Sequence, residues 1–203
     1  MSNNRPITVY ISAASDLITE REILARMVAE LPVTLAWRIV QTPISLVDTL
    51  DLDAVQQADF HILVIGSDIR APVGLELSVA RYHRRLTHAY LKQGLIRTLA
   101  GQSFVKDAAL EWQPFQSYTG LRFQVQKALI QHLLRFQLEY DLTLIEVEQL
   151  QDLQSVEAPT EQPAEVKDAG HSAVILSRER YEPSDGIALD HLVDKDNTAE
   201  ETK

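Results

Sequence analysis

Short apolar runs alternate along this chain with longer segments whose apolar residues recur at helical spacing. Residues 7–11 are β-branched or aromatic without a breaker, and residues 60–65 form a nearly continuous apolar run that Gly66 closes. Both runs have the length and composition of strands buried in a parallel sheet. Residues 33–40 predict a further strand between them.

Helices are predicted between these strands. The first has one apolar face, made by Ile23, Leu24, Met27, Val28 and Leu31, and ends at Pro32. Thr19 with Glu22 fits a capping box at its start, and Asp16 is an alternative cap. A short helical turn opens at residues 51–53. Alternating strands and helices predict an α/β domain with right-handed crossovers onto a parallel sheet.

The second half of the domain is predicted mainly from helical periodicity. Residues 75–91 fit one helix, and residues 119–153 fit a long last helix, although residues 142–147 also alternate like a strand. Residues 94–116 support no assignment. In the long helix, Leu133, Phe136, Tyr140, Val147 and Leu150 follow a three-four spacing. This spacing predicts that the helix forms a homo-oligomer.

The composition changes at the end of the predicted helix, which divides the chain into a domain over residues 1–153 and a tail over residues 154–203. The tail is rich in Glu, Asp, Pro and Ala, and its apolar content is too low to offset the entropy of ordering it. We therefore expect a mostly disordered acidic tail. Its one apolar island, residues 172–177, is a candidate contact for a protein partner.

Charge and composition exclude several classes of protein. Of the net charge of −10, residues 151–203 hold −8, because they carry 5 basic against 13 acidic residues. The nearly neutral domain lacks the basic face that nucleic acid binding requires. The chain contains no cysteine, no signal-peptide pattern and no apolar run long enough to cross a membrane. We expect a cytoplasmic protein, and the six histidines lack metal-ligand spacing, so we expect no metal site.

The first candidate site follows the first predicted strand. Small residues Ser12, Ala13 and Ser15 precede Asp16-Leu17 and Glu20-Arg21 at a helix start. This arrangement resembles the opening of TIR-like bacterial proteins, a family related to TIR and nucleoside deoxyribosyltransferase folds and mostly described as a domain of unknown function. The resemblance implies a flavodoxin-like, three-layer sheet with nucleotide contacts in this loop. The structural alternative is that Asp16 caps the helix, while Glu20 and Arg21 pair on the surface.

The second candidate site follows the strand at residues 60–65. Gly66, Ser67 and Asp68 form a loop that leads to Glu76, which we place in the first turn of the next helix. Glu76-Leu-Ser-Val-Ala80 resembles the TIR segment whose glutamate acts in NAD cleavage, so the resemblance implies Glu76 as the catalytic residue. A carboxylate suits this chemistry because it stabilises an oxocarbenium-like sugar. The alternative is that the helix dipole alone favours a glutamate there.

Two functions follow from these residues. In the first, the protein hydrolyses the N-glycosidic bond of NAD or a related nucleotide, in a bacterial signalling or defence role and without a further cofactor. In the second, it is a non-catalytic nucleotide sensor or interaction module that self-assembles. The loop preceding Glu76 departs from the TIR pattern at Asp68-Ile-Arg70 and at residues 73–75, which favours the second function, whereas the position of Glu76 favours the first. A basic patch of Arg81, His83, Arg84, Arg85 and His88 predicts a solvated face or a contact for an acidic partner.

Overall fold

A computed structural model describes residues 5–44 and 48–156 of the chain. The predictions about the acidic tail beyond Val156, including the apolar island at 172–177, lie outside the described residues. Within the described residues, no helix is both long and apolar enough to span a membrane.

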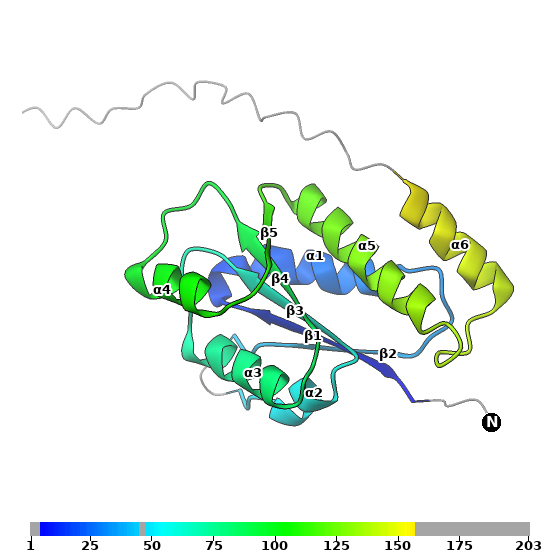
Figure 1. Cartoon of the computed structure of the whole chain (residues 1–203), viewed down its shortest axis with the longest axis horizontal. Coiled ribbons are helices and arrows are strands. Elements are labelled where there is room, and N and C mark those ends of the chain that lie inside the picture. Colours follow the sequence, from blue (N-terminus) through cyan, green and yellow to red (C-terminus); the bar gives the residue numbers. More distant parts are fainter. Residues whose placement is uncertain (1–4, 45–47, 157–203) are drawn as a thin grey trace, which may run out of the picture. The chain divides into compact units, whose positions relative to one another are not determined.

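Five parallel strands form one sheet in the order β2-β1-β3-β4-β5 (Figure 1). The strands are β1 Ile7–Ala13, β2 Trp37–Gln41, β3 Phe60–Ile65, β4 Thr87–Lys92 and β5 Trp112–Phe115. β1 and β3 are buried at every position, which explains their uninterrupted apolar sequences. The predicted α/β class, with a flavodoxin-like parallel sheet and flanking helices, is confirmed.

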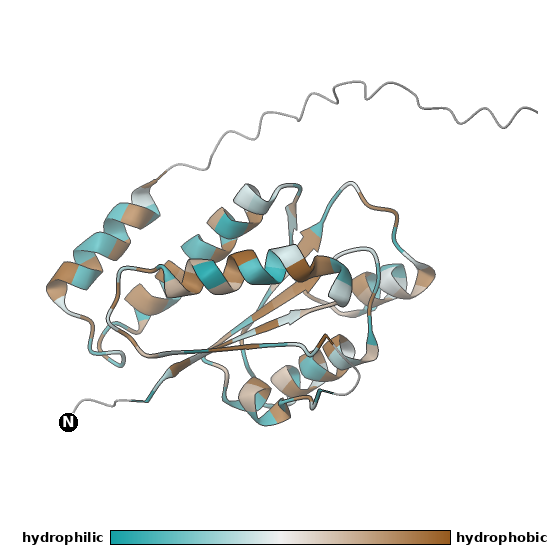
Figure 2. Ribbon diagram, turned by 180° about the vertical axis from the view of Figure 1, so that it is seen from behind, coloured by the Kyte–Doolittle hydropathy of each residue, from teal (hydrophilic) through white to brown (hydrophobic). Residues whose placement is uncertain are grey.

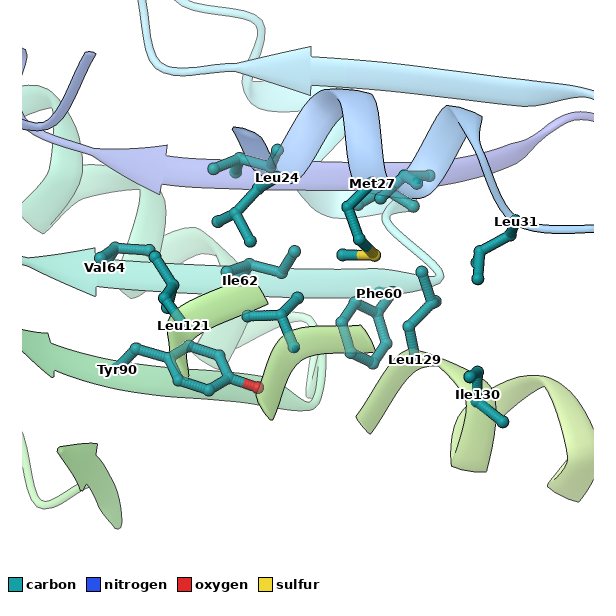
Figure 3. Packing of buried hydrophobic residues seen from close by; sticks show 14 of the residues in the cluster. Leu24, Met27, Leu31, Phe60, Ile62, Val64, Tyr90, Leu121, Leu129 and Ile130 are labelled. Carbon is teal, nitrogen blue, oxygen red and sulfur yellow. The ribbon is translucent and has the colours of Figure 1, made fainter. Parts of the chain in front are cut away.

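The helices cover both faces of this sheet. They are α1 Ile18–Ala29, α2 Leu52–Gln57, α3 Ala71–Tyr82, α4 Leu99–Asp107, α5 Tyr118–Arg135 and α6 Leu144–Ser155. α1 and α5 pack on one face, where their side chains meet those of β3 and β4 in the largest apolar cluster (Figure 3). α2 and α3 pack on the opposite face. In Figure 2 the central strands are largely apolar, whereas the helices mix apolar and polar positions, as two-sided burial of the sheet requires.

The predicted start of the second strand and the predicted capping of the first helix are wrong. β2 begins at Trp37 rather than Val33. α1 is preceded by a 3₁₀ turn over Ser15–Leu17, and its N-cap, Leu17, makes no side-chain hydrogen bond. The predicted caps therefore do not form, because Asp16 is engaged elsewhere, as described below.

The helix predicted over residues 75–91 is also wrong at both ends. α3 begins at Ala71, with Pro72 in its first turn, where a missing N–H costs nothing. It ends at Tyr82, and Arg84 then adopts a left-handed conformation with φ of 55°. The chain that follows is β4, which pairs with both β3 and β5. Strand pairing has overridden the helical periodicity of these residues. In the unassigned stretch 94–116 the structure places α4 and β5.

The predicted single last helix is two helices. α5 ends at Arg135, Asp141 is left-handed with φ of 53°, and α6 begins after Thr143 with a capping box to Glu146. Leu133 and Leu150, on which the predicted oligomer seam depended, are fully buried in the core of their own chain. These two residues are therefore not available for a contact between chains, and the homo-oligomer itself stays a prediction.

Candidate functional site

The carboxyl ends of β1 and β3 lie side by side and bring the two predicted loops together. Ser12 is in register with Leu63, and the Asp16 carboxylate accepts hydrogen bonds from the Ser67 backbone N–H at 3.0 Å and its hydroxyl at 2.7 Å. Parallel strands end at the same sheet edge, which is where ligands bind in open α/β folds. The predicted adjacency of residues 12–16 with the loop after Gly66 is confirmed.

The Asp-Leu-x-x-Glu-Arg motif ties three strand ends to the start of α1. Asp16 holds the loop after β3, and Glu20 accepts from Lys92 Nζ, at the end of β4, at 2.6 Å. Arg21 donates to the Gln41 side chain at 3.2 Å and to the backbone carbonyl of Thr42, just after β2. Glu20 and Arg21 are only 2% and 3% exposed, so the alternative of a surface pair between them is wrong. The motif therefore joins the start of α1 to the carboxyl ends of β2, β3 and β4 through buried polar contacts.

A pocket of ≈ 300 Å³ opens at this edge. Its walls are the loop after β1, the loop after β2 and the start of α3, with lining residues Ala13, Ala14, Ser15, Thr42, Pro43, Ile44, Asp48, Leu50, Arg70, Ala71, Pro72 and Val73. Most of these side chains are apolar, and Arg70 and Asp48 supply opposite charges.

Two of the predicted nucleotide contacts, Ala13 and Ser15, line this pocket. Asp16, Gly66 and Ser67 lie at the neighbouring loop contact, and the Asp68 carboxylate accepts a hydrogen bond from Thr98. Ser12 is fully buried and is not among the residues that line the pocket. The loop after β2 also lines the pocket through Thr42 and Pro43. The sequence analysis names no site residue there, because no motif follows that strand.

Glu76 lies in the second turn of α3 rather than the first, since the helix begins earlier than predicted. Its side chain has no solvent exposure. Tyr10 donates to Glu76 Oε1 and Thr42 donates to Oε2, each at 2.7 Å, and Ser12 hydrogen-bonds the same carboxylate. The helix-dipole explanation for a glutamate in the first turn therefore does not apply to Glu76.

Burial raises the pKa of Glu76, against the opposing effects of hydrogen bonds from Ser12, Tyr10 and Thr42 and of the Arg21 charge. Burial likewise lowers the pKa of Arg21, whose Nη1 has no hydrogen-bond partner among the described residues. Perturbed groups of this kind gather at functional sites more often than elsewhere.

The polar network continues from Glu76 across the sheet. Ser12 Oγ lies 2.8 Å from His61 Nε2, and His61 Nδ1 lies 2.9 Å from Thr87 Oγ1. His61 is fully buried, and burial lowers its pKa to about 4. The prediction of His61 as a satisfied core histidine is confirmed. Within residues 5–44 and 48–156, no three histidine, aspartate or glutamate side chains are grouped to hold a metal ion.

The predicted basic patch loses one member. His88 belongs to β4 and stacks on Phe60 in the core, with ring centroids 4.3 Å apart. Arg81, Arg84 and Arg85 remain exposed at the end of α3, away from the residues that line the pocket.

No protein-family model, curated protein or solved structure matches this chain. The resemblance to TIR-like proteins remains a prediction, and the functional argument depends on the geometry of the pocket.

Proposed function

We propose that this protein binds a nucleotide in the pocket at the carboxyl edge of its sheet and does not cleave it. The observation that carries the proposal is the position of the pocket, between the loops after β1 and β2 and the start of α3. The strand order reverses direction after β1, and open α/β sheets bind nucleotides near such a point.

The chemistry of the lining suits the parts of a mononucleotide. Apolar side chains such as Ile44, Leu50 and Val73 offer a surface for a base. Asp48 is an acceptor for ribose hydroxyls, and Arg70, at the positive end of α3, is a cation for a phosphate. A volume of ≈ 300 Å³ is near the lower limit for ligand pockets, so a mononucleotide fits better than NAD.

The environment of Glu76 argues against glycosidic hydrolysis. A carboxylate that stabilises a reacting sugar must approach it closely. Glu76 is fully buried and does not line the pocket, and its two oxygens already accept hydrogen bonds from Tyr10 and Thr42. These contacts favour a sensor or binding module over an enzyme.

Calorimetric titration of the full chain with AMP, ADP and NAD tests the proposal. We expect AMP to bind, and Arg70→Ala to weaken that binding about tenfold through loss of a charge-assisted contact. Arg81→Ala is the matched control, because Arg81 is an exposed arginine of the same helix outside the pocket.

Product analysis after incubation with NAD separates the two functions. Binding without release of nicotinamide supports the sensor. Release of nicotinamide that Glu76→Gln abolishes would establish the hydrolase instead, and no binding of any nucleotide would reject both.

A further inference from the structure

Thr42 belongs both to the wall of the pocket and to the buried network around Glu76. Its hydroxyl donates to Glu76 Oε2 at 2.7 Å and accepts from the Ala13 backbone N–H at 3.1 Å. A hydroxyl carries a single hydrogen. While Thr42 donates that hydrogen to Glu76, it has none to offer to a ligand in the pocket.

We propose that Thr42 is a specificity-determining residue of the pocket whose hydrogen-bond donor is switched on by a proton on Glu76. In the protonated state the Glu76 O–H donates to Thr42 Oγ1, and the Thr42 hydroxyl turns to donate to an acceptor atom of the bound nucleotide. The other acceptor within its reach, the Ile11 carbonyl oxygen, is 3.5 Å away and makes only a long hydrogen bond. The proton comes from solution and stays on Glu76. This inference rests on the proposed nucleotide binding for its ligand, and on the contacts of Thr42 for its mechanism.

The two oxygens of Glu76 are not equivalent sites for that proton. Oε1 accepts from the phenol of Tyr10, and Oε2 accepts from the aliphatic hydroxyl of Thr42. A phenol is the more acidic and hence the stronger donor, so it best stabilises the oxygen that stays unprotonated. The contrast between Tyr10 and Thr42 therefore favours a proton on Oε2, facing Thr42.

Charged and titratable groups from three elements face Glu76. Arg21 of α1 favours the ionised carboxylate, whereas burial favours the protonated one and raises the pKa. Tyr10 of β1 stays a neutral donor because burial, Glu76 and Asp51, the N-cap of α2, all raise its pKa. The two effects on Glu76 oppose each other, which makes its protonation responsive to its surroundings.

His61 of β3 reaches Glu76 only through Ser12. If Ser12 donates to Glu76, its lone pair accepts from His61 Nε2–H, and His61 Nδ1 accepts from Thr87. His61 is then a neutral donor of fixed tautomer. With its pKa lowered to about 4 by burial, it does not compete with Glu76 for the proton.

The Ala13 amide reports the switch without any ligand, because it donates to Thr42 Oγ1. In NMR spectra of the full chain, we expect the Ala13 amide resonance to titrate in step with the Glu76 carboxyl carbon, over a pH range above the ordinary one of a glutamate because burial raises the pKa of Glu76. In Glu76→Gln the carboxamide donates to Thr42 at every pH, and the Ala13 titration should vanish. An Ala13 resonance that is constant in the wild type, or that titrates equally in Glu76→Gln, overturns the proposal.

Binding of AMP measured over the same pH range tests the consequence for the ligand. We expect the affinity of the wild type for AMP to rise about three- to tenfold from the alkaline to the acid end of this range, beyond the change in Glu76→Gln, whose affinity varies only with the titration of AMP itself. Thr42→Val should lose this difference, and Thr42→Ser, which keeps the hydroxyl, should retain it. Equal pH profiles for the wild type and Thr42→Val overturn the proposal.

The two proposals fail differently. If Ala13 titrates with Glu76 but no nucleotide binds at any pH, the proposed nucleotide binding is wrong. The control of the Thr42 donor by Glu76 is then supported, and it acts on another ligand. If AMP binds but Ala13 does not titrate, the nucleotide site stands and the inference about Thr42 falls.

Discussion

Gly66 lies where the chain leaves β3, and a Cβ at this position would come 2.7 Å from Asp16 Oδ2 and 3.1 Å from a Leu17 methyl group. The Asp16 carboxylate cannot move away freely, because it holds the Ser67 N–H and hydroxyl. The close approach of β3 to the start of α1 therefore requires glycine. A Cβ at Gly74, inside α3, would meet no neighbouring group of the described residues within 4 Å.

We expect Gly66→Ala to lower the free energy of unfolding by about 1–3 kcal/mol, because it displaces Asp16 from its hydrogen bonds. Gly74→Ala is the matched control, and it should raise the free energy of unfolding by about 0.5–1 kcal/mol through helix propensity. Urea unfolding measures both changes. Equal effects of the two substitutions would contradict the account of Gly66.

Arg84 occupies a left-handed position, φ of 55°, where a helix end usually places glycine. The backbone N–H of Arg85 bonds the carbonyl of Ala80 at 2.7 Å, which closes the end of α3. We expect Arg84→Gly to stabilise the protein by about 0.5–1 kcal/mol in thermal unfolding, because it removes the steric cost of the side chain. Arg81→Gly, within the last turn of the helix, should destabilise it by a similar amount.

A buried carboxylate adds to the apolar contacts that hold helix α6 to the domain. Glu146 accepts from the N–H and hydroxyl of Thr34 at 2.6 and 2.7 Å, and from the N–H and hydroxyl of Thr143 at 2.8 Å each. Thr34 lies 112 positions away in sequence, so the capping box of this helix is also a tertiary contact. Burial alone would raise the pKa of Glu146, but these hydrogen bonds prevail and lower it to about 2.

We expect Glu146→Ala to destabilise the protein by about 2 kcal/mol, since it leaves several donors without their acceptor. Glu148→Ala, at an exposed position of the same helix, should change the stability by less than about 0.5 kcal/mol. Hydrogen exchange should show faster opening of α6 in Glu146→Ala. Unchanged exchange there would contradict the role of Glu146.

The pKa of Glu146 also predicts how this contact depends on pH. A folded-state pKa below the ordinary value of 4.5 gives stability that is fully present above about pH 4.5 and is lost as the pH falls towards 2. Glu146→Ala should remove this part of the acid dependence, which urea unfolding at a series of pH values can measure.

At the scale of the whole molecule, two buried histidines make the free energy of unfolding depend on pH. Their effect begins at a higher pH than that of Glu146. Burial, together with the smaller effect of a neighbouring histidine's charge, lowers the pKa of both His61 and His88 to about 4. The unfolded chain binds these protons near the ordinary value of 6.5, whereas the folded chain binds them only near 4. The unfolded state thus holds more protons between these values, and stability falls as the pH drops through that window.

We expect the free energy of unfolding to decrease by on the order of a few kcal/mol between about pH 6.5 and about pH 4. His88→Phe should reduce this slope, because His88 stacks on Phe60 and its Nε2 has no hydrogen-bond partner to lose among the residues that the structure describes. His83→Phe, at the surface turn after α3, is the control. A wild-type stability that is constant over this window would refute the prediction.

The class of fold and the presence of the first three strands could be predicted from the sequence, because the signal is local. A strand buried on both faces needs apolar residues at consecutive positions, and β1 and β3 have them. The small residues after β1 and the loop after β3 likewise predict a site at the carboxyl edge of the sheet, where the pocket lies. Each of these patterns is complete within about ten residues of chain.

Long-range contacts determined the rest, and no local pattern contains them. Residues 87–92 form a strand only because β3 and β5 supply partners on both sides, although their periodicity also fits a helix. Glu146 contacts Thr34 across 112 positions of sequence, and Thr42 enters the site because β2 lies beside β1. Glu76 was identified from its sequence context as a catalytic carboxylate, but packing of α3 against β1 buries it under Tyr10 and Thr42. Burial and hydrogen-bond partners are properties of the assembled sheet, since they depend on residues that meet only after the chain has folded.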